Sequence, residues 1–162
     1  MYRVWSNKPI VEVYDVNQDS DKFFKPLGLW FEVVGDYDWK WWCKSEMPEW
    51  MESFKYVYKI IFNENAKILR LTNDSEVLNL NKKYPGYLDY PDWVQIAREY
   101  GGIEIAPYSW ELRFNKNCGW YYTWDCASGC LWNKNAVKDL ILLDLNKEKG
   151  LQEEIYVRHL DF

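Results

Sequence analysis

The sequence predicts an α+β domain with a mostly antiparallel sheet and with its helices grouped on one side of that sheet. Two observations predict this class. Short segments in which large apolar residues alternate with polar ones, typical of strands, lie towards both ends of the chain. Segments with apolar residues three and four positions apart, typical of helices, interrupt them. A chain of 162 residues is expected to form a single domain, residues 1–162.

The first predicted strand covers residues 2–6, with Arg3 on one face and Tyr2 and Val4 on the other. A polar loop at residues 17–27 follows it. The remaining strands are predicted at residues 28–34, 53–63, 67–71, 103–108, 111–114, 120–125 and 154–160. Periodicity does not decide whether residues 135–146 form a short helix or a strand with a turn.

Three helices are predicted from their caps and their periodicity. They run from residues 35–36 to 47–48, from residue 73 to residues 85–86, and from residue 91 to residues 101–102. Asn73 and Glu76 have the spacing of a capping box at the start of the second helix. The first helix carries Trp39, Trp42 and Cys43 along one face, and most of this aromatic face is expected in the core.

The charge balance bears on the class of partner. The chain has 20 Lys and Arg residues against 25 Asp and Glu residues, a net charge of −5. Long-range attraction to a phosphate backbone is therefore not favoured, and an extended nucleic acid is not the expected partner. The 11 Trp and 13 Tyr residues suit a core, a stacking platform for a nucleobase or an anchor at a protein interface, and composition does not choose among these roles.

No apolar run is long enough for a signal peptide or a transmembrane helix, so a cytoplasmic protein without a membrane partner is expected. Reduced thiols are expected because Cys43, Cys118, Cys126 and Cys130 lack the paired spacing of a structural zinc site. The alternative is a metal site made by the last three of these cysteines and His159, but their irregular spacing does not favour it.

The strongest candidate for a functional stretch is residues 119–133, GWYYTWDCASGCLWN. Its first half alternates aromatic residues like a half-buried strand, and Asp125 then follows between Trp124 and Cys126. A partly desolvated carboxylate in such a setting can act as a base or stabilise a developing positive charge. The alternative is a turn in which Asp125 bonds its own backbone and Gly129 supplies a positive φ.

Several short motifs resemble those of the ADP-ribosyltransferase fold. They are the arginine of Tyr2-Arg3 on the first strand, the GLWF of residues 28–31, the YVYKIIF of residues 56–62 and the YGGI of residues 100–103. Their order is similar to that of small phage-encoded and bacterial members of the family, among them an anti-CRISPR enzyme. The resemblance extends from Tyr2 to about Leu143.

This resemblance implies a split sheet whose cleft binds NAD as a substrate, and transfer of ADP-ribose to a protein target by a phage or bacterial effector or anti-defence protein. Asp125 is the implied catalytic carboxylate, and Glu104 competes with it because it follows the YGGI motif. Cleavage of the nicotinamide glycosidic bond builds positive charge on the ribose, which a fixed carboxylate stabilises.

The residues implied to contact NAD lie mostly on the first two strands. Arg3 is implied to contact a ribose or a phosphate, whereas the GLWF strand is implied to lie under the nicotinamide with Trp30 or Phe31 stacked on the ring. The complete set of implied cofactor contacts is Arg3, Ser6, Gly28, Trp30, Phe31 and Ser128. An alternative for Arg3 is a solvated side chain or an ion pair with a surface carboxylate.

The chain departs from the family pattern because it lacks the Ser-Thr-Ser stretch, has Glu32 near the place of a serine and has no Glu-x-Glu or Gln-x-Glu pair before its last strands. Two other functions therefore stay open. One is a binding or inhibitor protein whose aromatic surface contacts a host protein. The other is a protein that binds a mononucleotide by stacking the base on aromatic side chains.

Overall fold

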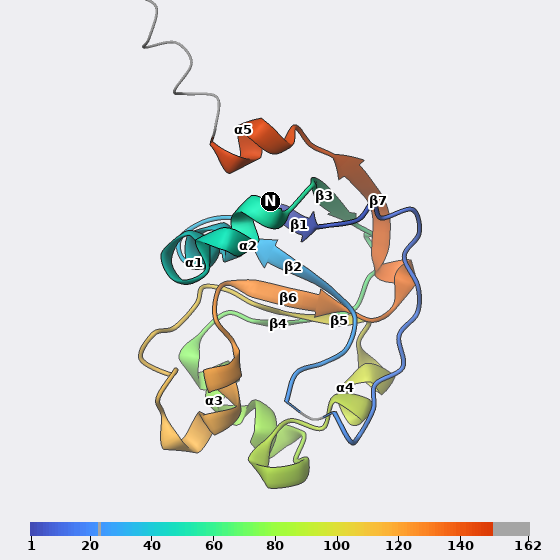
Figure 1. Cartoon of the computed structure of the whole chain (residues 1–162). Helices are drawn as coiled ribbons and strands as arrows, with labels where there is room; N and C mark the ends of the chain where they lie inside the picture. The colour runs from blue at the N-terminus through green and yellow to red at the C-terminus, as the bar shows by residue number, and fades with distance from the viewer. Residues whose placement is uncertain (23, 151–162) are drawn as a thin grey trace, which may run out of the picture.

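A computed structural model of the chain describes residues 1–22 and 24–150 (Figure 1). The described residues form one seven-stranded sheet with the order β4-β5-β6-β2-β1-β3-β7. Its strands are β1 Tyr2–Ser6, β2 Leu29–Val33, β3 Tyr56–Phe62, β4 Ile68–Leu71, β5 Gly102–Ile105, β6 Ser128–Leu131 and β7 Val137–Leu142. Every neighbouring pair is antiparallel except β4 and β5, which confirms the predicted mostly antiparallel sheet.

The contact between β1 and β2 is the shortest in the sheet. Within the described chain these strands pair at Tyr2↔Val33 and Arg3↔Glu32 alone, whereas β1 pairs with β3 over four residues and β2 pairs with β6 over four. Beyond Arg3 and Glu32, β1 therefore follows β3 and β2 follows β6. The sheet is continuous in its hydrogen bonding, so it is not split into two sheets, but it opens at this point.

The helices begin where short polar side chains can accept bonds from free backbone N–H groups. Asp38, Asn73 and Asp92 cap α1, α3 and α4 in this way, and each accepts from the N–H three residues ahead. The α-helices of the described chain are α1 Trp39–Glu46, α2 Pro48–Ser53, α3 Asp74–Lys83, α4 Trp93–Glu99 and α5 Leu145–Lys149. The 3₁₀ helices are η1 Tyr87–Asp89, η2 Lys116–Thr123 and η3 Lys134–Ala136.

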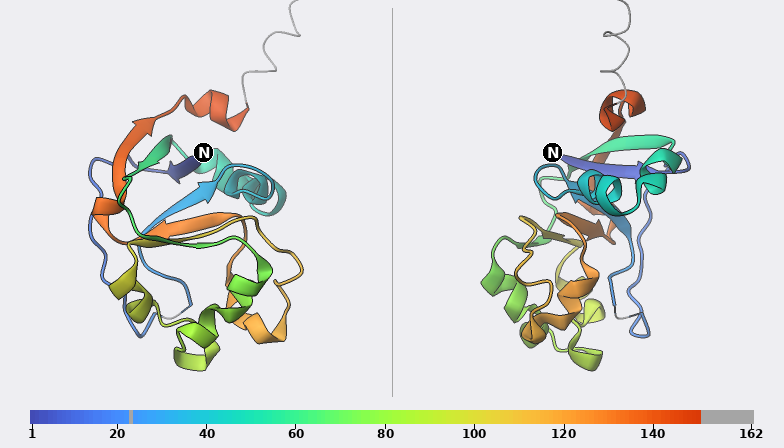
Figure 2. Two further views of the ribbon diagram at one scale, coloured as in Figure 1. Left: turned by 180° about the vertical axis from the view of Figure 1, so that it is seen from behind. Right: turned by 60° about the vertical axis from the view of Figure 1, so that its left-hand side comes forward.

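One face of the sheet carries the helices. Ile103 and Ile105 of β5 pack in one core with apolar residues of α3, α4 and η2, and Trp5 and Val57 pack in another with residues of α1 and α2. In Figures 1 and 2 the green α3 and the yellow-green α4 lie against the β4-β5-β6 part of the sheet, and the teal α1 and α2 lie beside β2. The prediction that the helices gather on one side is confirmed for α1 to α4.

The opposite face curls onto itself. The Tyr2 hydroxyl on β1 donates to a Glu104 carboxylate oxygen on β5 at 3.4 Å, although β6 and β2 separate these strands in the sheet order. Tyr2 also stacks on Phe62, with ring centroids 4.5 Å apart, and meets Phe31 edge to face. This curl buries an apolar core that includes Val4, Phe31 and Leu131.

Residues 111–125 are not strands, contrary to the prediction. Residues 111–114 form a turn, and residues 120–125 fall in the 3₁₀ helix η2 and the loop after it. The alternation of aromatic residues resembled that of a strand, but Trp120, Tyr121 and Trp124 are all buried in the core with α3 and α4. Their spacing follows the turns of a 3₁₀ helix.

The strand of this stretch is β6, and Gly129 lies inside it. The alternative of a turn with a positive φ at Gly129 is excluded, since this residue is not among the positive-φ residues of the described chain. Glycine is needed there for another reason: a Cβ would lie 2.3 Å from the Ile103 carbonyl oxygen and 2.3 Å from Cζ of Phe31. The strands beside β6 leave no room for a side chain.

Other predictions are refined by the structure. The helix predicted from residue 35 begins at Trp39. Its aromatic face was expected in the core but is only half-buried, and Cys43 is the one fully buried residue of α1. Helix α2 was not predicted from the sequence. The undecided segment 135–146 contains strand β7, whereas the strand predicted at residues 154–160 lies outside the described residues.

Candidate functional site

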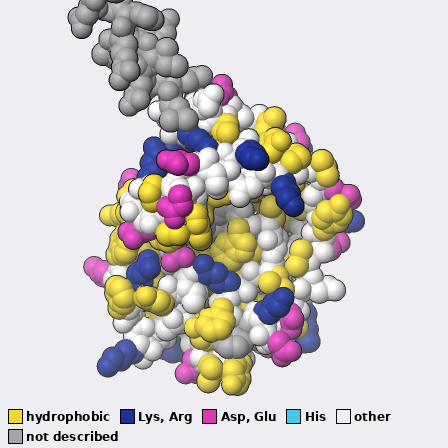
Figure 3. All heavy atoms as spheres, viewed as in Figure 1, with side chains coloured by type: hydrophobic (Ala, Val, Ile, Leu, Met, Phe, Trp, Pro, Cys, Tyr) yellow, Lys and Arg dark blue, Asp and Glu magenta, His cyan; other side chains and the backbone are white. Residues whose placement is uncertain are grey.

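A pocket of about 370 Å³ opens where β1 and β2 diverge, on the face of the sheet that carries the helices. In the view of Figure 3 the surface is hollowed over β2 and β6, with hydrophobic side chains in the hollow and basic side chains beside it. Trp5 on one strand and Trp30 on the other flank the divergence. The described lining residues are Arg3, Trp5, Lys25, Trp30, Phe31, Glu32, Trp39, Phe54, Asp125, Cys126 and Ser128.

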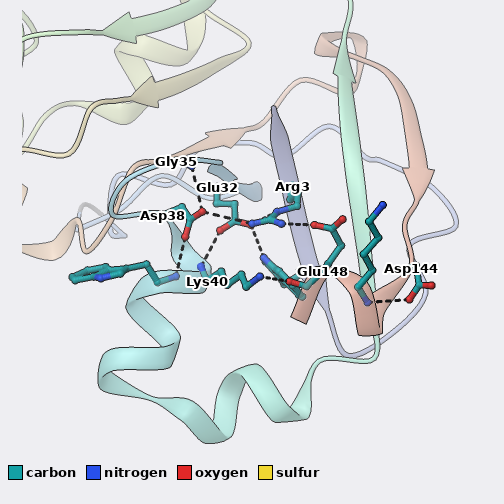
Figure 4. A network of polar contacts seen from close by, with 10 residues as sticks. Arg3, Glu32, Gly35, Asp38, Lys40, Asp144 and Glu148 are labelled. Carbon is teal, nitrogen blue, oxygen red and sulfur yellow. Dashed lines mark hydrogen bonds and ion pairs between the residues drawn. The ribbon is translucent and has the colours of Figure 1, made fainter. Parts of the chain in front are cut away.

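Buried charges occupy one end of this pocket (Figure 4). The Arg3 side chain is 5% exposed, and each of its nitrogen atoms faces a carboxylate. Its Nε donates to Glu32 Oε1 at 2.6 Å, its Nη1 donates to Glu148 Oε2, and its Nη2 lies 3.6 Å from Asp38 Oδ2. Figure 4 shows Glu32 and Asp38 on one side of the guanidinium and Glu148 on the other.

Glu32 is fixed from several directions. Besides Arg3, it accepts hydrogen bonds from the Trp5 indole N–H at 2.7 Å and from the Lys40 backbone N–H at 2.9 Å. Burial raises the pKa of Glu32, while the Arg3 charge and these donors act in the opposite direction. The pKa of Arg3 is raised because its carboxylate partners outweigh the effect of burial. The ion pair and these donors therefore hold the two side chains in one geometry.

Helix α5 closes this end of the pocket from outside. Glu148 of α5 binds Arg3 through its side chain and accepts from the Lys40 ammonium through its backbone carbonyl. Lys149 donates to the Glu52 and Phe54 carbonyls at 3.0 Å and 2.8 Å. These contacts tie α5 to the segment between α1 and β3. Because each nitrogen atom of Arg3 faces one of three carboxylates, the guanidinium presents no free fork to a phosphate.

The other end of the pocket is more open. Asp125 lies in the loop between η2 and β6, and its side chain is 26% exposed. Lys25 Nζ lies 3.3 Å from its Oδ2, and Arg113 Nη2 lies 3.5 Å from its Oδ1. The Lys25 ammonium also lies 5.3 Å from the ring centroid of Trp30, in the range of a cation–π contact. Asp125 is thus a charged group at the rim.

Aromatic rings form the walls between these two ends. Trp5 and Phe54 lie 5.9 Å apart between ring centroids, and Trp30 is backed by the fully buried Trp124 at 5.0 Å. Trp39 of α1 completes the lining and stacks on Trp42. A flat apolar or cationic ring fits such walls, because aromatic faces both exclude water and attract positive charge.

The structure brings together five of the residues predicted for a site. Arg3, Trp30, Phe31, Asp125 and Ser128 all line this pocket. The Arg3 guanidinium and the Asp125 carboxylate were expected to share one cleft. Both line this pocket, although the two residues lie far apart along the chain. The hydroxyl of Ser128 donates to the Cys126 carbonyl at 3.0 Å and so already has an acceptor.

The other predicted residues lie elsewhere. Glu104 sits next to Ile105 on β5, and Ile105 pairs with the pocket residue Ser128, so the side chain of Glu104 points to the opposite face of the sheet. There it accepts from Arg70 and Tyr2. Ser6 donates to the Lys8 carbonyl at 2.6 Å, outside the described lining.

Gly28, predicted under the nicotinamide, serves the packing of the sheet. It has a φ of 153°, and a Cβ there would lie 2.2 Å from the Leu131 carbonyl oxygen of β6. Gly28 is therefore required for the close approach of β2 to β6, and the described lining of the pocket does not include it.

Several lining residues were not predicted from the sequence, namely Trp5, Lys25, Glu32, Trp39, Phe54 and Cys126. Glu32 appeared only as a departure from a family pattern. Its strand position held a usable signal, because a glutamate inside the apolar run LWFEV needs a buried partner, and Arg3 on the predicted first strand is a candidate for that partner. Lys25 had no such signal, since it lies in a polar loop.

The cysteines do not form a reactive or metal-binding centre in the described part of the chain. Cys43, Cys118, Cys126 and Cys130 are free and buried. Burial raises the pKa of Cys126, which lines the pocket, to about 12. No group of His, Cys, Asp and Glu side chains suited to a metal is found among the described residues, and His159 lies outside them.

Comparison of the chain with protein-family models, with curated proteins and with solved structures found no match. The resemblance to ADP-ribosyltransferases gains no support from these comparisons and stays a prediction from the sequence. No helix within residues 1–22 and 24–150 has both the length and the hydrophobicity that crossing a membrane requires.

Proposed function

We propose that this protein is an NAD-dependent ADP-ribosyltransferase that modifies a protein target in the cytoplasm, as a phage or bacterial effector or anti-defence protein. The observation that carries the proposal is the position of Asp125, a partly exposed carboxylate at the rim of a pocket walled by Trp5, Trp30, Trp39 and Phe54. A pocket of about 370 Å³ is at the small end of the usual range for ligand sites. It suits the nicotinamide and its ribose, with the rest of NAD at the mouth.

In this proposal the nicotinamide ring stacks on Trp30 and its ribose lies beside Asp125. The bond between C1′ of the ribose and the ring nitrogen breaks, and its electron pair leaves with neutral nicotinamide. The ribose becomes a cation that the Asp125 carboxylate stabilises more strongly than it stabilises the ground state. A nucleophilic side chain of the target then bonds to C1′ and releases its proton to solvent. The aromatic walls exclude competing water.

Arg3 has a different role here from the one that the resemblance implies. Its nitrogen atoms face Glu32, Asp38 and Glu148, so Arg3 holds the buried end of the pocket in one geometry and does not bind phosphate. The basic group that lines the open end is Lys25, whose side chain is 37% exposed. Lys25 is the proposed partner of the NAD phosphates.

The test is incubation of the protein with radiolabelled NAD and a bacterial lysate, with release of nicotinamide and labelling of protein as the two readouts. Asp125→Asn is expected to lower both rates by about 10²-fold or more, the loss typical of a removed electrostatic group. Asp139→Asn, at an exposed position on β7, serves as the control and is expected to keep wild-type rates. Absence of nicotinamide release together with absence of any NAD-induced rise in melting temperature would remove the proposal.

A second candidate function is binding of a host protein without catalysis. An aromatic surface beside Asp125 favours it: Tyr37 and Trp110 are each 40% exposed and meet edge to face, and Arg113 lies over both Trp110 and Tyr122. Tyr, Trp and Arg are the residues that most often dominate protein interfaces.

This second candidate is tested by affinity capture with wild-type protein, Trp110→Ala and Asp125→Asn. A partner that is recovered in equal amount with wild type and Asp125→Asn, and lost with Trp110→Ala, supports non-catalytic binding. A melting temperature that responds to mononucleotides and not to NAD indicates instead the third function, binding of a nucleobase.

A further inference from the structure

A cation already occupies the most accessible part of the pocket. The Lys25 ammonium lies 5.3 Å from the ring centroid of Trp30 and 3.3 Å from Asp125 Oδ2. An aromatic face and a carboxylate thus converge on one point, and the charge held there is positive. This is the arrangement with which proteins bind organic cations.

Lys25 is held at this point only weakly. Its side chain is 37% exposed and flexible, and an exposed ion pair of this kind contributes about 1 kcal/mol or less. Arg113, the other partner of Asp125, is fixed more firmly, since its guanidinium donates to the Tyr108 hydroxyl at 3.1 Å and lies over Trp110 and Tyr122. When Lys25 moves away, Arg113 therefore continues to orient Asp125 while the face of Trp30 becomes free.

The remaining charges of the pocket disfavour an anion at the same point. Arg3 lies among carboxylates and is neutralised by them, and the Glu32 carboxylate is itself part of the lining. An anionic group placed on Trp30 would meet Asp125 and the quadrupole of the ring, both of which repel it.

We propose that Lys25 occupies the place of a ligand's positive group, so that the pocket selects ligands with a fixed positive charge on a flat ring and binds them by displacing the Lys25 ammonium from Trp30 and Asp125. The inference rests on the proposed function in that the oxidised nicotinamide ring of NAD carries such a charge. It concerns binding alone and does not require that any bond is cleaved.

The probes are 1-methylnicotinamide, whose methylated ring nitrogen gives the ring a fixed positive charge, and nicotinamide, the neutral ring with the same amide. Each is titrated into the wild-type protein, and binding is measured by isothermal calorimetry. The wild type is expected to bind the cation at least about fivefold more tightly than the neutral ring, the ratio that a cation–π contact gives at an exposed site. Equal affinities, or a preference for neutral nicotinamide, would overturn the inference.

Lys25→Gln is the decisive variant, because it removes the resident charge and keeps a side chain of similar length. It is expected to bind 1-methylnicotinamide about fivefold or more tightly than wild type does, since the ligand no longer competes with the Lys25 ammonium for Trp30 and Asp125. Lys22→Gln, an exposed position outside the described lining, is the matched control and is expected to leave the affinity unchanged. An unchanged or weaker affinity in Lys25→Gln contradicts the inference.

The outcomes separate this inference from the proposed function. Selection for the cation without release of nicotinamide from NAD supports the inference and removes the enzymatic proposal. Release of nicotinamide without selection for the cation leaves the enzymatic proposal in place and overturns the inference. The comparison of the two probes on wild-type protein needs no variant to fold.

Discussion

The two ends of the pocket hold their charges in contrasting ways. At the closed end, Arg3 is 5% exposed and Glu32 is fully buried, and helix α5 covers them through Glu148. At the open end, Asp125 is 26% exposed and its partner Lys25 is 37% exposed. Charges that are buried and mutually satisfied stabilise one geometry, whereas charges at a rim can exchange one partner for another at little cost. The closed end therefore stabilises the fold, whereas the open end is the part at which a ligand can replace a resident charge.

The largest expected effect is on the closed end. Arg3→Met leaves Glu32 and Asp38 buried without their cation, which is expected to lower the free energy of unfolding by about 3–5 kcal/mol. Arg70→Met is the matched control, because Arg70 also pairs with a glutamate on the sheet but is 47% exposed, and it is expected to cost about 1 kcal/mol or less. Urea unfolding measures both. Equal losses of unfolding free energy in the two variants would contradict the contrast between the buried ion pairs of Arg3 and an exposed one.

A smaller effect is expected when only the outer carboxylate of the closed end is removed. Glu148→Gln keeps the shape of the side chain but removes its charge, and the loss of a charged hydrogen bond is expected to lower the free energy of unfolding by about 1.5–3 kcal/mol. Lys147→Gln, at a position on α5 whose side chain has no part in the Arg3 network, is the control. A loss as small as that of the control would mean that α5 does not close the pocket.

The Cys126 thiol gives a pH-dependent effect of about 1 kcal/mol. Burial raises its pKa from an ordinary value of 9.0 to about 12, so the folded protein keeps the thiol proton where the unfolded chain has lost it. The resulting stability is fully present below pH 9.0 and declines as the pH rises towards 12. Between pH 8 and about pH 10, wild type should lose roughly 1 kcal/mol more than Cys126→Ala in urea unfolding under reducing conditions.

The same loss in both proteins would show that the thiol is hydrated in the folded state. The pocket would then admit water to its wall, and the distinction between a dry interior and an exchangeable rim would weaken.

The smallest effect on stability is expected at the open end. Asp125→Asn removes partly exposed ion pairs with Lys25 and Arg113 and is expected to change the free energy of unfolding by about 1 kcal/mol or less. A loss as large as that of Arg3→Met would make Asp125 a structural residue and would remove the contrast between the two ends.

The sequence predicted the parts of the fold whose local signals agree with their packing. The Asn73 cap and the apolar stripe of α3 are confirmed, and so is the strand YVYKIIF. The cap of the helix and the periodicity of both elements are local signals that span only a few residues. Residues 120–125 were mispredicted because the strand-like alternation of aromatic residues came from a 3₁₀ helix buried on several sides. Tertiary burial, not local preference, determined that segment.

The candidate site was predicted in part. Asp125 was a candidate because it is a carboxylate in aromatic surroundings and Arg3 because it lies on the first predicted strand, and both line one pocket. An ion pair of Arg3 was one of the alternatives from the sequence, but the sequence could not show that Glu148 takes part in it, because the two residues are 145 positions apart along the chain. Lys25 was missed for the same reason: its partner Asp125 lies 100 positions away, and a polar loop alone does not reveal such a pair.

The most direct test of the central claim is a crystal structure with an NAD analogue whose ribose ring oxygen is replaced by carbon, which keeps the glycosidic bond intact. With the analogue at millimolar concentration, the nicotinamide ring is expected against Trp30, its ribose beside Asp125, and the Lys25 ammonium displaced from both. An analogue bound at another surface, or a pocket that is empty with Lys25 still on Trp30, would contradict the account.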